Sequence, residues 1–321
     1  MRPLLLGPYA PRAARRATAV ALFFQWFIVI TGATVRLTGS GLGCPNWPTC
    51  TTTRAVPELE QHALIEFLNR MTTTPTLLTA IAALWICWRL VGAARRDLRI
   101  ATSLVVGGVF VQAGLGALTV ILELPPEIVA VHFLVSIGLL AAATFAWCAA
   151  TSDAPLRLTR RAGRGAALVA VAMLTLLLAI IVAGVATTAS GPHSGAAGTG
   201  QTVDRFQLFD LAIMLHARGA YLFLALIVVL TLWRRQRGAA LRDLSLLLLL
   251  VAGQITLGEV QYRTGLPWGI VLAHVVNAAL LWILATRIAV DAAFEPRARD
   301  LLADADPAVP QGDVHPLVST P

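Results

Sequence analysis

Long uninterrupted apolar runs most strongly constrain what this chain can fold into. The hydrocarbon core of a bilayer is about 30 Å thick, and a helix needs about 20 consecutive apolar residues to cross it. The chain is 57% apolar and 13% charged, whereas soluble domains carry roughly 25% charged residues. These values exclude a soluble globular enzyme, and the sequence predicts an all-α integral membrane protein. We expect transmembrane helices near 17–36, 71–92, 101–122, 128–150, 165–188, 211–233, 243–262 and 267–290.

The distribution of positive charge predicts the orientation of these helices. The formal net charge of +8 comes from 25 arginines and no lysine. Nineteen arginines fall in the termini and the even-numbered loops. Cytoplasmic loops carry the excess of basic residues, so both termini are expected in the cytoplasm. The charge therefore indicates topology, and no nucleic-acid partner is expected. The six arginines on the opposite side are Arg36, Arg54, Arg70, Arg205, Arg218 and Arg263.

The predicted spans divide the chain into two halves of four helices. The first span has no convincing cleavage site, so we interpret it as an uncleaved helix rather than a signal peptide. The C-terminal segment is rich in Asp, Ala and Pro and is expected to be disordered. The expected organisation is a cytoplasmic N-terminus at 1–16, an N-terminal half at 17–150 with an outer loop at 37–65, a cytoplasmic linker at 151–164, a C-terminal half at 165–290 and a cytoplasmic tail at 291–321.

An internal similarity supports this division. A shift of 142 residues places 112–139 on 254–281 without a gap, and nine of the 28 positions are identical. The matches include Gln, Pro and His, which are scarce inside membranes. Four helices per half give both halves the same orientation, which predicts pseudo-symmetry about an axis along the membrane normal.

Three histidines are expected at one depth in the membrane. His132, His216 and His274 each lie about two turns into an even-numbered helix, counted from its outer end. A single intramembrane histidine often only bonds to a neighbouring helix. Three at matched depth favour ligation, because ionisable groups in the bilayer are costly and usually functional. Imidazole is a common axial ligand of heme iron, and a four-helix bundle lets two facing histidines hold one macrocycle.

The two predicted heme sites are not equivalent. His216 and His274 form a bis-histidine pair in the second half. In the first half, His132 corresponds to His274, and Asn69 stands at the position equivalent to His216.

Polar residues share one face of the second predicted helix at its outer end. Glu66, Asn69 and Arg70 have the spacing i, i+3, i+4. In one interpretation Glu66 and Arg70 are only an interfacial ion pair. In the other, Glu66 is a carboxylate beside the reacting edge of a porphyrin, and Arg70, or Arg218 in the second half, contacts a propionate.

The four cysteines fall into two classes by location. Cys44 and Cys50 share the first outer loop, on the oxidising side of the membrane, so a disulfide is expected there. That disulfide either rigidifies a Pro-rich loop or acts as a redox-active lid. Cys87 and Cys148 fall near cytoplasmic helix ends and are expected to be inert thiols.

Taken together, these motifs resemble heme A synthase, and the resemblance covers essentially all eight spans. It rests on the segment 31–42, TGATVRLTGSGL, which leads into the cysteine loop, on Glu66 with Arg70, on the segment 112–116 before His132, on the loop 191–195, and on Gln254 with His274.

The resemblance implies a heme b cofactor on His216 and His274, substrate heme O near His132, and Glu66 as a catalytic carboxylate. The implied reaction oxidises the C8 methyl of heme O to a formyl group through hydroxylated intermediates. It also implies a plasma or inner membrane location with heme sites toward the outer face. Implied partners are the lipid bilayer, an unidentified electron donor, a heme O synthase and cytochrome oxidase assembly factors.

Asn69 departs from the family pattern, which usually has a fourth histidine there. We therefore expect His132 to be the only protein ligand of the substrate iron. Two other functions remain open on the sequence. One is an electron-transfer cytochrome b subunit, and the other is a heme-binding transporter or assembly chaperone.

Overall fold

The computed structural model is a bundle of long helices. It describes residues 9–57, 59–89, 91, 95–152, 154–158, 164–200, 203–236 and 241–296. Within these residues, eight helices are long and apolar enough to cross a membrane. The helices are α1 Tyr9–Leu37, α2 Gln61–Arg89, α3 Arg96–Ile121, α4 Pro126–Thr151, α5 Arg164–Ser190, α6 Phe209–Gln236, α7 Arg242–Arg263 and α8 Trp268–Ala293.

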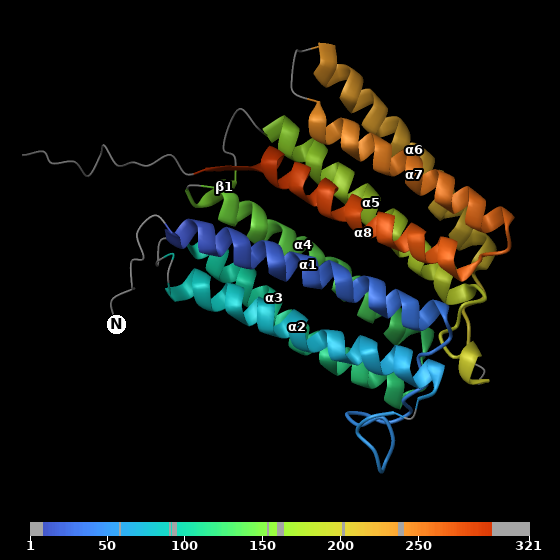
Figure 1. Cartoon of the computed structure of the whole chain (residues 1–321). Coiled ribbons are helices and arrows are strands. Elements are labelled where there is room, and N and C mark those ends of the chain that lie inside the picture. Colours follow the sequence, from blue (N-terminus) through green and yellow to red (C-terminus); the bar gives the residue numbers. More distant parts are fainter. Residues whose placement is uncertain are drawn as a thin grey trace, which may run out of the picture.

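Contacts between the helices arrange α1 to α4 as one ring and α5 to α8 as a second, and the two lie beside each other in Figure 1. In the first ring α1 contacts α2, α2 contacts α3, α3 contacts α4, and α4 contacts α1. The second ring repeats this order with α5, α6, α7 and α8. The rings meet where α1 and α4 pack against α8 and where α4 contacts α5. Each ring thus encloses its own interior, and α8 borders both.

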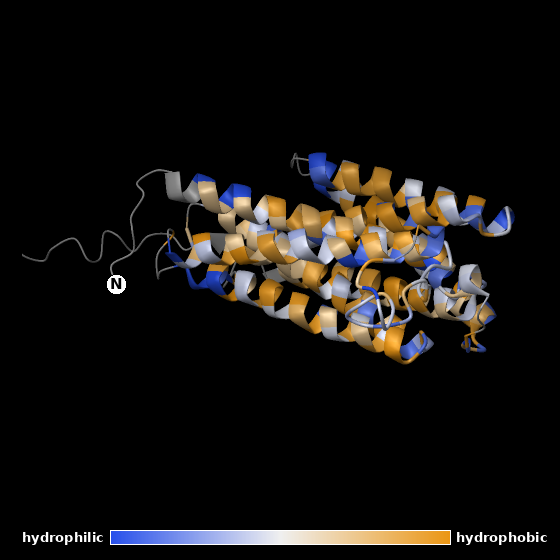
Figure 2. Ribbon diagram, turned by 60° about the horizontal axis from the view of Figure 1, so that its bottom comes forward, coloured by the Kyte–Doolittle hydropathy of each residue, from blue (hydrophilic) through white to orange (hydrophobic). Residues whose placement is uncertain are grey.

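The outer surface of the bundle suits a lipid environment. Figure 2 shows hydrophobic residues along the helices and hydrophilic residues gathered toward the two ends. Large apolar side chains such as Phe23, Leu168 and Leu249 are exposed, with relative exposures of 51%, 71% and 68%. The buried interface between the rings is also apolar, and Trp282 Nε1 donates across it to the Ile137 carbonyl at 2.9 Å.

Helix bounds differ from the predictions where polar residues sit inside a helix. The second helix was predicted at 71–92, but α2 covers Gln61–Arg89. The apolar pattern misses its first turns because Glu66, Asn69 and Arg70 are polar, and their hydrogen bonds are made to other segments. The first helix, α1, begins at Tyr9, inside the predicted N-terminal segment 1–16.

The predicted linker and tail contain a small sheet. β1 Leu156–Leu158 pairs antiparallel with β2 Phe294–Pro296, with Arg157 opposite Glu295. The first residues of the predicted tail 291–321 are therefore ordered against the linker, since paired strands satisfy each other's backbone groups. The rest of the predicted disordered tail, 297–321, lies outside the described residues.

Two turns have the same backbone geometry in the two rings. Leu124 and Leu266 both adopt a positive φ, 62° and 60°, which is uncommon for a residue with a side chain. Their amides donate at 2.7 Å to the carbonyls of Thr119 and Gln261, respectively. A proline follows each leucine and precedes α4 or α8. These pairs are separated by the same 142 residues as the sequence similarity.

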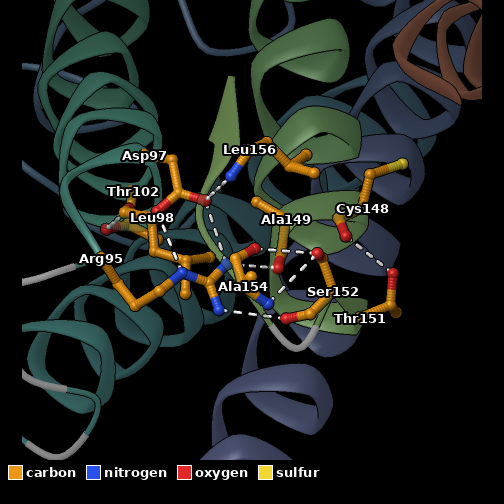
Figure 3. A network of polar contacts seen from close by, with 10 residues as sticks. All are labelled: Arg95, Asp97, Leu98, Thr102, Cys148, Ala149, Thr151, Ser152, Ala154 and Leu156. Atoms are coloured by element: carbon orange, nitrogen blue, oxygen red, sulfur yellow. Dashed lines mark hydrogen bonds and ion pairs between the residues drawn. The ribbon is translucent and has the colours of Figure 1, made fainter. Parts of the chain in front are cut away.

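Figure 3 shows a polar clamp at the end of the first ring where α3 begins. Arg95 donates to both carboxylate oxygens of Asp97, at 3.1 and 3.0 Å. It also donates to the carbonyls of Ser152 at 3.1 Å and Ala149 at 2.5 Å. Asp97 accepts the Leu156 amide at 3.1 Å. The clamp therefore joins the start of α3, the end of α4 and β1.

We expect Asp97→Ala to destabilise the bundle strongly. Asp97 is 6% and Arg95 11% exposed at the side chain, so the variant leaves a nearly buried guanidinium without its counter-charge and the Leu156 amide without its acceptor. Breaking such a pair costs about 3 kcal/mol. Asp243→Ala is the matched control, because its pair with Arg287 is about one-third exposed and contributes about 1 kcal/mol or less. The free energy of unfolding of both variants is measured in mixed micelles. Equal losses of unfolding free energy would contradict a special stabilising role of the clamp.

Candidate functional site

Both rings contribute to one large cavity at the end of the bundle that carries the cysteine loop. Its volume is about 1280 Å³, above the roughly 300–1,000 Å³ of ordinary small-molecule pockets. The lining is mostly apolar and includes few titratable side chains. Among these are His132, His216, His274, Glu66 and Arg36. The three histidines predicted at one depth therefore face a common space.

His216 on α6 and His274 on α8 face each other. Their ring centroids are 6.0 Å apart, with an angle of 59° between the ring planes. His216 Nδ1 lies 2.8 Å from the Ile180 carbonyl of α5. A carbonyl only accepts, so Nδ1 carries the proton and Nε2 keeps a free lone pair. This tautomer is the one that a metal ligand uses when its second nitrogen is held by the protein.

Glycines on neighbouring helices make room for these rings. A methyl group at Gly184 of α5 would come within 2.8 Å of His216 Cε1. At Gly258 of α7 it would lie 3.3 Å from His274 Cε1. The two imidazole rings therefore lie directly against helix backbone. The absence of a side chain at Gly184 and Gly258 fixes where each imidazole sits.

The first ring repeats this arrangement with one change. His132 on α4 lies against Gly116 of α3, where a methyl group would be 3.5 Å from Cε1. His132 Nδ1 is buried without a hydrogen-bond partner among the described residues. Asn69 occupies the place on α2 that His216 holds on α6, with Gly32 of α1 beside it. Its Oδ1 accepts from Thr31 Oγ1 at 2.7 Å.

Glu66 is a buried carboxylate with both oxygens occupied. Its residue is 3% exposed. Oε2 accepts the Cys44 amide at 2.7 Å, and Oε1 accepts Arg70 Nη2 at 2.5 Å. The ion pair considered from sequence is thus present, and it also borders the cavity.

Arg70 joins this carboxylate to the cysteine loop. It donates to the carbonyls of Cys44 at 2.7 Å, Asn46 at 2.8 Å and Thr49 at 3.3 Å. The predicted disulfide between Cys44 and Cys50 is confirmed. The loop therefore rests on α2 through one guanidinium and one carboxylate.

Other sequence-predicted residues lie away from the cavity. Arg218 is exposed on α6 and does not line the cavity, because it follows His216 by two residues and so lies on another face of the helix. Cys87 and Cys148 are buried free thiols, in line with their predicted packing role.

Sequence analysis overlooked two arginines near the cavity. Arg36, at the end of α1, lines the cavity and donates to the carbonyls of Thr188 at 3.1 Å and His193 at 3.2 Å. Arg205 donates to the Thr188 carbonyl at 2.6 Å and to the Gly191 carbonyl. Both had been counted as outer-side charges, and Arg36 also lies in the segment 31–42 that carries the family resemblance, but neither was predicted as a site residue. The available signal was Arg36 itself, a charge inside an otherwise apolar and small-residue segment.

Comparison with known proteins places the chain in a family. Residues 15–286 match the model of the COX15-CtaA family, described as "Cytochrome oxidase assembly protein". The chain belongs to this family. The match spans all eight helices apart from the first turns of α1 and the last turns of α8.

Individual relatives match over shorter segments. The chain is 32% identical over 126 residues to a heme A synthase of Bacillus pumilus, covering 39% of this chain and 41% of the relative. It is 34% identical over 122 residues to that of Bacillus licheniformis, covering 37% and 38%. For Lysinibacillus sphaericus the values are 33% over 126 residues, covering 36% and 41%. The chain thus spans about two-fifths of the length of the curated relatives it matches.

We expect Arg70→Gln to loosen the cysteine loop. The variant removes the donors to three loop carbonyls and to buried Glu66, so amide hydrogen exchange over 44–50 should accelerate about tenfold or more. Arg263→Gln is a matched control, because Arg263 also pairs with a glutamate four residues before it, Glu259, but is 76% exposed. Unchanged exchange over 44–50 in Arg70→Gln would show that the loop is held by other contacts.

Proposed function

We propose that this protein is an oxidoreductase, a heme A synthase that oxidises the C8 methyl of heme O to a formyl group through hydroxylated intermediates, for cytochrome oxidase assembly. Family membership and the names of the relatives support this reaction. The observation that carries it is one cavity that holds a facing histidine pair, a third histidine opposite Asn69, and a buried carboxylate.

The second ring fits a resident heme b held by His216 and His274. Metal–imidazole nitrogen bonds are about 2 Å long, so two imidazoles that would share one metal ion need ring centres about 6 Å apart. The observed centroid distance is 6.0 Å. The Ile180 carbonyl leaves His216 Nε2 free to ligate. When bound, heme b supplies one-electron redox chemistry.

The first ring then receives the substrate. His132 is the protein ligand available to the iron of heme O. Asn69 stands opposite with its Oδ1 bonded to Thr31, and a carboxamide is a weaker iron ligand than imidazole. The proposed substrate site therefore leaves one coordination position open. This differs from the usual bis-histidine pattern of the family.

Glu66 is the proposed catalytic group. Its carboxylate is held by the Cys44 amide and Arg70, so it sits at a fixed place on the cavity wall. As a carboxylate it would accept a proton at Oε1 or Oε2 and stabilise positive charge that develops on the substrate edge. A protein that only carries heme has little reason to bury such a carboxylate, because burial is costly.

The proposed topology has both termini in the cytoplasm and the cavity toward the outer face of the cell membrane. The excess of arginines at the opposite end supports it. The paired turns at Leu124 and Leu266 support an origin of the two rings by duplication. Proposed partners are a heme O synthase, cytochrome oxidase assembly factors and an electron donor.

An electron-transfer cytochrome b or a heme chaperone is the alternative. A transmembrane relay needs hemes at different depths, whereas all three histidines line one cavity at one end of the bundle. Expression with a supply of heme O, followed by extraction and mass identification of bound pigments, separates these functions. Heme A or its C8 alcohol beside heme b is the expected result. Heme b alone, despite confirmed heme O supply and added reductants, favours the alternatives.

In the same assay, Glu66→Gln is expected to retain heme b and to lower heme A formation by at least about 100-fold, the order that general acid–base groups contribute. Glutamine preserves the shape of the side chain and its bond to the Cys44 amide. Glu259→Gln removes an exposed glutamate that also borders the cavity, and it should form product normally. Normal product from Glu66→Gln would remove Glu66 from the mechanism.

Asn69 predicts the spin state of the substrate iron. With His132 as its single strong ligand, protein loaded with heme O should show a high-spin component in absorption and electron paramagnetic resonance spectra. Asn69→His should add a second imidazole and convert that component to low spin. A purely low-spin spectrum in the unmodified protein would contradict the single-ligand site.

A further inference from the structure

Two guanidinium groups converge where the rings meet. Arg36 comes from α1 of the first ring, and Arg205 precedes α6 of the second. Both donate to the same carbonyl, that of Thr188, at 3.1 and 2.6 Å. Each also bonds to one further carbonyl, of His193 or Gly191. Two like charges are thus fixed side by side by neutral backbone acceptors.

Neither guanidinium has a carboxylate within ion-pair distance among the described residues. Burial lowers the pKa of Arg205, and its Nε is buried without a hydrogen-bond partner. Like charges held side by side in a partly buried setting are unfavourable unless a counter-charge is supplied. Elsewhere in the described chain arginines do find carboxylates, in the pairs Arg70–Glu66, Arg95–Asp97, Arg263–Glu259 and Arg287–Asp243.

The missing counter-charge has access from the cavity. Arg36 lines the cavity, together with Thr188 and Ser194. The two bonds of Arg36 use Nε and Nη2, which leaves Nη1 available to a ligand. A guanidinium presents its donors in a planar fork that matches a carboxylate.

We propose that Arg36 forms a carboxylate-binding site of the cavity, with Arg205 held beside it through the shared Thr188 carbonyl, and that a propionate side chain of the bound tetrapyrrole occupies it. The inference rests on the proposed function for the identity of the occupant. Arg70 is committed to Glu66 and three loop carbonyls, and Arg218 lies outside the cavity. The site therefore replaces both as the propionate contact. It also orients the macrocycle, because it fixes which edge points toward the junction of the rings.

The test compares an acid with its ester. Full-length protein, purified without tetrapyrrole and placed in nanodiscs, is titrated with ferric protoporphyrin IX and with its dimethyl ester, and binding is followed by Soret absorbance. The acid is expected to bind at least about tenfold more tightly than the ester, because a charge-assisted bond is lost on esterification. Arg36→Gln and Arg205→Gln should each reduce this ratio toward one while affinity for the ester changes little.

Three comparisons make the result decisive. Arg218→Gln, an exposed arginine on α6, should keep the full ratio, and Arg205→Lys should keep part of it because the charge remains. Retained affinity for the ester shows that each variant is folded. Equal binding of acid and ester by the unmodified protein overturns the site but leaves the proposed function standing. Failure to bind either tetrapyrrole contradicts the proposed function itself. An unchanged ratio in both glutamine variants assigns propionate recognition to other residues.

Discussion

The hydrocarbon interior offers no hydrogen-bond partner, and every other feature of this fold is arranged around that constraint. Backbone groups are satisfied within eight helices. Polar side chains must then bond across helices. Gln112 of α3 donates to the His132 carbonyl at 3.0 Å and to Ser136. In the second ring Asn277 donates to Gln254 Oε1 at 2.7 Å. These bonds tie α3 to α4 and α7 to α8 beside the histidines.

Close contact between imidazole and glycine turns this scaffold into a site. A large side chain at Gly184 or Gly258 would push the rings of His216 and His274 into the cavity. Because glycine lets the ring lie on the neighbouring backbone, the ring plane is fixed by packing before any ligand arrives. Such pre-organisation is what holds a metal ligand in place. Arg218, two residues after His216 on the same helix, does not line the cavity.

Much of the fold follows from periodicity and charge, because a membrane helix leaves a strong local signal. The eight spans and the disulfide were predictable from sequence, and the three histidines singled out there line one cavity. The start of α2 was not, because Glu66 and Arg70 are satisfied by a loop that is distant in sequence. The pairing of β1 with β2 and the meeting of Arg36 with Arg205 were also missed. The strand pairing and the meeting of the two arginines depend on contacts between segments more than 100 residues apart, and no local pattern encodes them.

The two rings carry different residues at one pair of equivalent positions. Asn69 stands where the second ring has His216, and each lies beside a glycine of the preceding helix, Gly32 or Gly184. If both positions held histidine, each ring could saturate an iron with two imidazoles, which suits electron transfer and not chemistry at a substrate. One carboxamide in place of one imidazole is enough to separate these roles. The junction between the two rings is also asymmetric, because Arg36 comes from the first ring and donates to the Thr188 and His193 carbonyls of the second. The proposed duplication of a ring, followed by changes at these two positions, would account for the proposed cofactor side and substrate side within one cavity.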